Sequence, residues 1–158
     1  MAYKGKYTPT NPSKYRGDTT NIIYRSLLER RFMVYCDSNT AITWWASEEL
    51  SIPYVSPIDG KWHRYFVDFV VGVKDKSGKE NTIMVEIKPY RQCIAPKIRV
   101  FEDNVDRRKR DYRQYARTIK DWGVNSAKWA AAEQYCKQRG WTFKLVTDKD
   151  LKHGKEHL

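Results

Sequence analysis

Apolar residues recur along the first half of the chain at two spacings, and these spacings predict where helices and strands lie. Steps of three and four residues across 18–37 give an apolar stripe and predict a first helix, capped by Asp18 or Thr20. Runs rich in aromatic and β-branched residues predict strands at 41–46, 50–55, 65–73 and 81–88. A hairpin-type turn at 75–79 separates the last two.

The longest expected strand, 65–73, carries a carboxylate among apolar residues. Strict alternation along one strand places Phe66, Asp68 and Val70 on one face. The other face would then hold Tyr65, Val67, Phe69 and Val71.

Helical periodicity returns in the second half of the chain. We expect helices at 102–120 and 125–139, with Gly140 as the C-terminal stop, and a last strand at 141–147. The order helix, strands, helices, strand predicts an α/β domain with a central mixed β-sheet flanked by helices. We expect one domain at 18–150, an extended basic arm at 1–17 and a disordered tail at 151–158.

Composition and charge narrow the function. The chain has 158 residues and a formal net charge of +11, which favours a polyanionic partner such as nucleic acid. The strongest basic run is expected on the 102–120 helix and includes Arg107, Arg108, Arg110 and Arg113. We interpret it as a phosphate-binding surface, and the alternative is a solvated helix face.

Cysteines and apolar runs indicate the compartment. Cys36, Cys93 and Cys136 are widely spaced and form no C-x-x-C pair, which favours a reducing cytosol over a zinc or redox motif. No apolar run is long enough to cross a bilayer and the start of the chain lacks the apolar stretch of a signal peptide, so we expect no membrane partner.

The candidate chemistry lies in two acids on neighbouring strands. Asp68 and Glu86 are each surrounded by apolar residues, where a carboxylate is costly unless it is paired or bound to a metal. The 75–79 turn can bring them side by side, and a divalent cation would remove their repulsion. Lys88 shares a strand face with Glu86. The alternative is a structural ion-pair site.

Such a site suits phosphodiester hydrolysis. A cation held by carboxylates polarises a phosphate and lowers the pKa of a bound water, while a lysine can orient that water. The oxygen ligands, with the Ile87 carbonyl as a further candidate, favour Mg²⁺ or Mn²⁺ over zinc.

The pattern resembles the PD-(D/E)XK nuclease superfamily, which includes restriction endonucleases and TnsA-like enzymes. Asp68 and the Glu86-Ile87-Lys88 triplet match its motif, and Glu29, in Arg25-Ser-Leu-Leu-Glu29, resembles the acid on its first helix. Val67 departs from the motif, which usually has proline there. The resemblance implies a restriction-endonuclease-like core, αβββαβ, with Glu29, Asp68, Glu86 and Lys88 catalytic and the three acids as metal ligands.

Within that superfamily, the sequence resembles one subgroup more closely still, the head completion nucleases of T4-like tailed phages. The resemblance rests on Met-Ala-Tyr-x-Gly-Lys-Tyr-Thr-Pro at the start and on segments 14–18, 52–54, 63–66 and 86–89. It implies a DNA endonuclease or end-trimming nuclease in the host cytoplasm, and in the virion head, with DNA and portal or head proteins as partners. The alternative is a catalytically inactive DNA-binding or portal-binding structural protein of the virion head.

Three polar residues near the motif receive weaker expectations. Arg25 lies four residues before Glu29, on the same face of the expected helix, and could approach a phosphate; the alternative is an ordinary surface arginine. Gln92 follows the second acidic strand and could extend the site towards DNA. For His63 we favour a structural or binding role.

Overall fold

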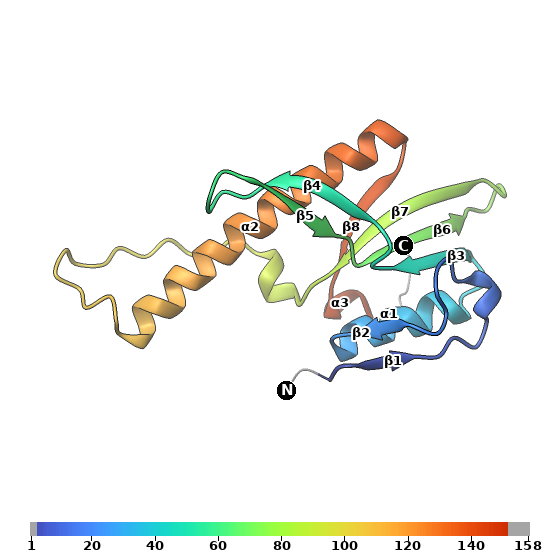
Figure 1. Cartoon of the computed structure of the whole chain (residues 1–158), viewed down its shortest axis with the longest axis horizontal. Coiled ribbons are helices and arrows are strands. Elements are labelled where there is room, and N and C mark those ends of the chain that lie inside the picture. The colour runs from blue at the N-terminus through green and yellow to red at the C-terminus, as the bar shows by residue number, and fades with distance from the viewer. Residues whose placement is uncertain (1–2, 152–158) are drawn as a thin grey trace.

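The computed structural model describes residues 3–151, and its centre is a four-stranded mixed sheet in the order β3-β6-β7-β8 (Figure 1). Strands β3 (Ile42–Ser47), β6 (Phe69–Lys74) and β7 (Glu80–Ile87) are antiparallel neighbours. Strand β8 (Thr142–Val146) pairs in parallel with β7. With α1 (Leu27–Ser38) and α2 (Arg110–Arg139), the core order is α1-β3-β6-β7-α2-β8, which confirms the expected αβββαβ architecture.

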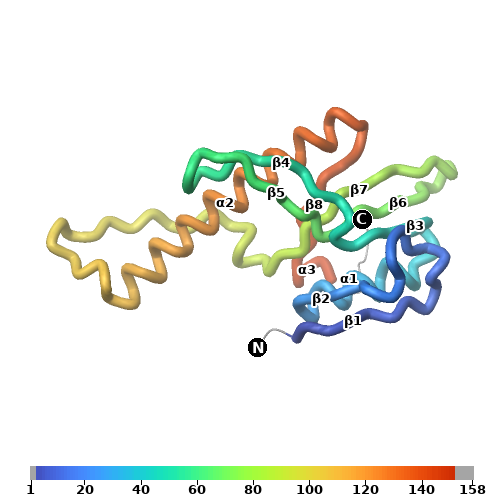
Figure 2. Tube along the Cα trace, viewed as in Figure 1, coloured from blue at the N-terminus to red at the C-terminus, as the bar shows by residue number. Residues whose placement is uncertain are grey.

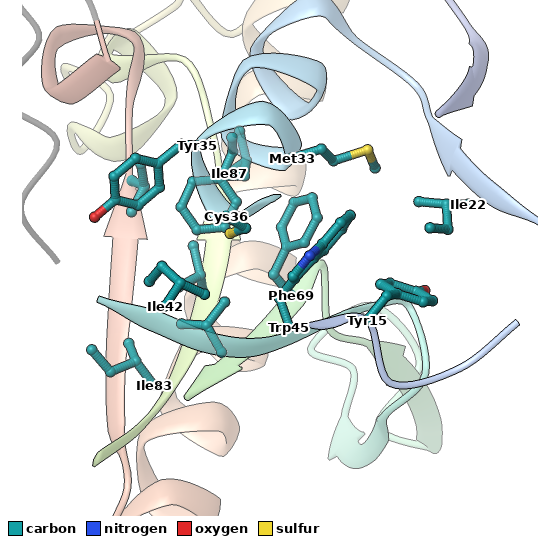
Figure 3. Close-up of a cluster of buried hydrophobic side chains, with 14 residues drawn as sticks. Tyr15, Ile22, Met33, Tyr35, Cys36, Ile42, Trp45, Phe69, Ile83 and Ile87 are labelled. Carbon is teal, nitrogen blue, oxygen red and sulfur yellow. The ribbon is translucent and has the colours of Figure 1, made fainter. Parts of the chain in front are cut away.

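The two helices cover opposite faces of this sheet. Figure 3 shows the cluster on the α1 side, where Phe32, Met33 and Cys36 pack against Trp45 and Phe69. On the other face, Val70 and Met84 pack with residues of α2, including Ala132 and Cys136. Every sheet residue named here is at least nine-tenths buried, so the sheet is apolar on both sides.

The expected strand at 65–73 is two strands, and the prediction of one continuous strand was wrong. β5 (Trp62–Phe66) pairs with β4 (Ser51–Val55) in a separate hairpin, whereas β6 pairs with β3 and β7. The chain changes sheets at Val67 and Asp68, so the alternation breaks there. Tyr65 and Val67 pack on the α2 side with Val70, while Phe69 and Val71 pack on the α1 side.

The expected first helix begins later than predicted. Residues 22–24 form strand β2 (Ile22–Tyr24), and α1 starts only at Leu27. Ser26 is the N-cap, because its hydroxyl accepts a hydrogen bond from the Glu29 N–H at 3.1 Å. Asp18 instead accepts hydrogen bonds from Thr20, in a local turn that competes with helix. Arg25 therefore does not share a helix face with Glu29.

The N-terminal segment is extended and is bound to the domain. Strand β1 (Gly5–Tyr7) pairs with β2, and a short 3-10 turn, η1 (Pro12–Lys14), leads to the buried Tyr15. The Asp37 carboxylate accepts hydrogen bonds from the Tyr7 hydroxyl at 2.8 Å and from the backbone of Thr10 at 2.6 Å. These contacts tie residues 5–15 to the end of α1. Two lysines of the N-terminal segment differ in setting: Lys14 donates to two backbone carbonyls, whereas Lys6 is exposed.

The two helices expected at 102–120 and 125–139 are one helix, α2, of 30 residues. No proline interrupts it, and Gly123 adopts no left-handed conformation, so the backbone continues through 121–124. Residues 102–109 are not helical, which places Arg107 and Arg108 before the helix. The expected stop is confirmed, because Gly140 has a φ of 69° at the C-cap.

The first half of α2 projects beyond the sheet, and the segment before it runs back alongside (Figures 1 and 2). We call residues 94–120 the basic arm, which is distinct from the extended arm expected at 1–17. The Phe101 ring lies 5.0 Å from that of Tyr112 and 5.3 Å from that of Tyr115. Arg99 holds Asp111 through two hydrogen bonds of 2.8 and 2.6 Å. Residues 94–109 of the arm therefore form an ordered strap along the first half of α2.

The chain ends, as far as it is described, in α3 (Asp148–Leu151), and Leu151 packs against the α1-side core. The remainder of the tail expected to be disordered, residues 152–158, lies outside the described residues. None of the helices within 3–151 has the length and apolar character that a membrane span requires.

Candidate active site

Asp68 stands at the point where the chain leaves the β4–β5 hairpin and enters the central sheet. One of its carboxylate oxygens accepts a hydrogen bond from the Ile87 N–H at 2.9 Å, which fixes it against the end of β7. Burial, followed by the nearby charges of Glu86 and Glu29, raises the pKa of the Asp68 carboxyl well above its usual range. The fold thus holds this acid where its ionised form is costly.

Glu86 lies on β7, one residue before the backbone group that binds Asp68. Its side chain is 5% exposed, and one oxygen lies 3.4 Å from the ammonium nitrogen of Lys88. The Tyr65 hydroxyl donates a hydrogen bond to its other oxygen. Burial and the charge of Glu86 raise the pKa of Tyr65, so this phenol stays protonated and remains a donor.

Glu29 reaches the same place from the first turn of α1. Its carboxylate accepts a hydrogen bond from the Arg25 backbone N–H at 2.8 Å, which bends the chain before the helix back towards it. Burial raises the pKa of Glu29, whereas the hydrogen bond from Arg25 and the charge of Lys88 act to lower this pKa. The charges of Glu86, Glu29 and Lys88 all act on the pKa of the Asp68 carboxyl, so the four residues share one neighbourhood, and we call them the acidic centre.

The structure adds two residues that sequence reasoning missed. Tyr65 supports Glu86 from the adjacent hairpin, but its signal was hidden by the expectation of one continuous strand. Glu48 follows β3 with a φ of 56°, which is unusual for a side-chain-bearing residue. Its N–H donates to the Asp68 carbonyl at 3.1 Å, and its carboxylate binds the Arg25 guanidinium. Glu48 thereby holds both Asp68 and Arg25.

The donor chemistry of the acidic centre fits a hard divalent cation. Glu86 is buried and Asp68 is partly buried, their like charges oppose one another, and a cation between the two carboxylates would relieve both costs. Among the residues that the structure describes, no three His, Cys, Asp and Glu side chains form a ready-made ligand set. The expected set of Asp68, Glu86 and Glu29 therefore stays a prediction.

Comparison with known proteins agrees with this geometry. The model of the TnsA-like endonuclease N-terminal family matches residues 39–148, which contain Asp68, Glu86 and Lys88. This chain belongs to that family. It is also 39% identical over 152 residues to the head completion nuclease of Enterobacteria phage T4, across 96% of this chain and 95% of that protein. Both family resemblances drawn from the sequence are confirmed. Glu29 precedes the segment that the family model matches.

A cleft of about 670 Å³ adjoins the acidic centre of this TnsA-like domain. It lies between α2 and the short 3-10 helix η2 (Tyr90–Cys93), and Lys88 and Gln92 both line it. The expected position of Gln92 beside the site is thus observed. Arg91 and Lys128 add positive charge to the cleft, and Asp121 is an acid within it. The cleft offers polar and basic groups directly next to Lys88.

The remaining candidate DNA-binding residues lie away from the acidic centre, on the basic arm. Arg110 and Arg113 occupy the first turn of α2, while Arg107 and Arg108 precede it, and all four are exposed. Arg108 forms an exposed ion pair with Asp106 at 3.1 Å. Arg25 differs from this group, because it is beside Glu29 and paired with Glu48.

His63 has a structural setting, in agreement with one of its two expected roles. Its ring nitrogen lies 2.8 Å from the Asp59 carboxylate, and its ring packs 5.9 Å from that of Tyr54. These contacts tie the turn of the β4–β5 hairpin to β5 and pack β5 against β4.

Proposed function

We propose that this protein is a metal-dependent deoxyribonuclease that acts in phage head completion. The observation that carries the proposal is the pair Asp68 and Glu86 at the edge of the core, with Lys88 3.4 Å from Glu86, in a chain of the TnsA-like endonuclease family. A divalent cation, Mg²⁺ or Mn²⁺, would be held by Asp68 and Glu86, with Glu29 as a third acid. Bound there, it would supply a Lewis acid and a water of lowered pKa.

The chain's own residues divide the remaining work. Lys88, facing the cleft, would orient the attacking water and balance charge that develops on the phosphate. Tyr65 would hold Glu86 in place by donating to one of its oxygens, which leaves the other oxygen for Lys88 or the cation. Glu48 would position Arg25, whose guanidinium it binds, for a phosphate near Glu29.

DNA would be held largely by its phosphates. Gln92 lies in the cleft beside Lys88, and the phosphate backbone would continue along the exposed arginines of the basic arm, which are Arg107, Arg108, Arg110 and Arg113. Such contacts position DNA without reading its sequence. Substrate preference therefore has to come from elsewhere in the molecule.

The biological setting follows from the relative in phage T4. That protein is a head completion nuclease, and the similarity extends over 96% of this chain. We propose the same role here, with DNA as the substrate in the infected host cell and portal or head proteins as further partners. A place in the virion head belongs to the same proposal.

Plasmid nicking by the purified protein tests the enzymatic part. We expect nicked and linear products in Mg²⁺ or Mn²⁺ and none in EDTA. Glu133, an exposed acid of α2 outside the basic arm, provides the matched control, since Glu133→Gln removes one carboxylate outside the site. Activity that persists in EDTA, or an inactive protein that still binds DNA and portal protein, would contradict the proposal.

A further inference from the structure

The outer face of the β4–β5 hairpin exposes large aromatic side chains. Trp62 is 72% exposed and Phe66 is 56% exposed, although most other aromatic residues lie in or against the two cores. Val55, opposite Trp62 on β4, is 44% exposed. An exposed apolar surface with polar groups around it is typical of an interaction site.

The alternation along β5 arranges these side chains in a row. Tyr65 is buried against the α2-side core, so Trp62, Arg64 and Phe66 point to the opposite, solvent side. Neighbours in this row are two residues apart, which separates them by about 6.6 Å along the strand. An arginine thus lies between two aromatic rings, a combination that can stack on bases and bind the phosphates between them.

The inner face of the same hairpin is fixed to the domain. Ile52, Tyr54 and Tyr65 pack with residues of α2, and the ammonium nitrogen of Lys128 lies 5.5 Å from the centre of the Tyr65 ring. The Tyr65 hydroxyl also binds Glu86. The outward row is therefore held in a defined position relative to the acidic centre.

The row also leads directly to the proposed catalytic acid. Phe66 ends β5, and only Val67 separates it from Asp68. The end of the aromatic row therefore lies two residues along the chain from the proposed catalytic acid.

We propose that Trp62, Arg64 and Phe66 form a stacking platform for unpaired bases, so that the preferred substrate is DNA with single-stranded character next to the cut. This inference rests on the proposed function, because it names the class of DNA that the same site cuts. Charge favours DNA over a protein as the occupant: Arg64 lies inside the row, Lys61 precedes it, and the chain carries +11. A fully paired duplex would hide its bases from these rings.

Binding measured in EDTA tests the platform without relying on catalysis. Fluorescence anisotropy would compare single-stranded, forked and blunt duplex DNA of one length. We expect Trp62→Ala and Phe66→Ala each to weaken binding of single-stranded and forked DNA on the order of 10-fold, with little change for blunt duplex. Trp62→Phe should keep most of the affinity, because it retains a ring. Quenching of 2-aminopurine placed in the unpaired arm would report stacking directly.

Val55→Ala is the matched control, because it removes an exposed apolar side chain from the same face without removing a ring. It should leave binding of all three DNAs unchanged, and thermal melts should show that each variant is folded. An equal loss for all three DNAs, or no loss for any in Trp62→Ala, would overturn the platform. If the variants bind DNA as predicted but the wild-type protein does not nick DNA, the proposed nuclease function fails and the stacking platform stands.

Discussion

The acidic centre and the basic arm carry opposite charges and are built in opposite ways. Glu86 is buried and Asp68 partly buried at the sheet, where both oxygens of Glu86 and one oxygen of Asp68 have backbone or side-chain partners. The arginines of the arm are exposed on a segment that projects beyond the sheet (Figure 2). Chemistry needs fixed geometry in a water-poor site, whereas phosphate binding needs positive charge that can stay solvated. The residues proposed for cutting and those proposed for phosphate binding therefore differ in how far they are exposed to solvent.

The largest expected effect is the loss of cutting when the acidic centre is changed. Asp68→Asn and Glu86→Gln should each reduce plasmid nicking by at least about 10³-fold, because metal stabilisation of the transition state is worth several kcal/mol. Both replacements keep the shape and can accept hydrogen bonds, so the fold should survive. Nicking by Glu133→Gln should match the wild type. A folded Asp68→Asn that cuts normally would remove Asp68 from the mechanism.

A smaller loss is expected for the lysine that links the centre to the cleft. Lys88→Ala should lower nicking by about 10²-fold, because one preorganised positive group near the reacting phosphate is removed. Its affinity for Mn²⁺ should be intact or raised, since the ammonium competes with the cation for Glu86. Lys79→Ala, in the exposed β6–β7 hairpin, is the control. Failure of folded Lys88→Ala to bind Mn²⁺ would make the lysine structural.

Changes on the basic arm should affect binding and not chemistry. Replacing Arg107, Arg110 and Arg113 with alanine should weaken duplex binding for all sequences alike. The log–log salt slope should fall by about 0.9 for each phosphate that the variant no longer neutralises. Cutting should partly recover at high protein concentration. Titrations across a salt series measure the slope.

The matched control removes the same charge from another surface. Lys74, Lys76 and Lys79 lie on the exposed β6–β7 hairpin, and their replacement with alanine should alter the slope less than the arm variant does. Equal slopes for the two triple variants would show that the arm is a solvated surface without a role in DNA binding. The DNA would then have to bind elsewhere on the protein.

The smallest expected effect is on stability. Burial and Glu86 raise the pKa of Asp68, so the fold favours the protonated acid. That contribution to stability is complete below the ordinary aspartate pKa of about 3.9 and is lost as pH rises through the raised value. In EDTA, Asp68→Asn should therefore raise the melting temperature at neutral pH, with the difference vanishing towards pH ~3. Thermal melts across pH would show the trend, and a destabilised variant at neutral pH would contradict it.

The acidic centre could be predicted from the sequence because burial makes a carboxylate conspicuous. Asp68 and Glu86 are embedded in apolar strand residues, and the turn at 75–79 forces their strands together. The roles of Tyr65 and Glu48 could not be predicted from the sequence, since they depend on where β5 leaves its hairpin and on one residue with positive φ. Neither feature leaves a periodic signal.

The elements themselves were predicted least well at their ends and junctions. Residues 22–24 have the apolar spacing of a helix but pair with β1 as a strand, a tertiary contact that local pattern does not contain. Residues 121–124 interrupt the amphipathic pattern, yet the backbone stays helical because no residue there forbids it. The predicted bounds of the central strands β3 and β7 agree with the structure to within one residue, because their apolar runs are bounded by clear turns and proline.

Mn²⁺ titration calorimetry on the wild type, Asp68→Asn and Glu133→Gln at one neutral pH tests the central claim most directly, because it asks whether Asp68 and Glu86 form a metal site. We predict a binding isotherm for the wild type, the same isotherm for Glu133→Gln and none for Asp68→Asn. Equal Mn²⁺ affinity in all three folded proteins would contradict this claim and would separate Asp68 from any metal.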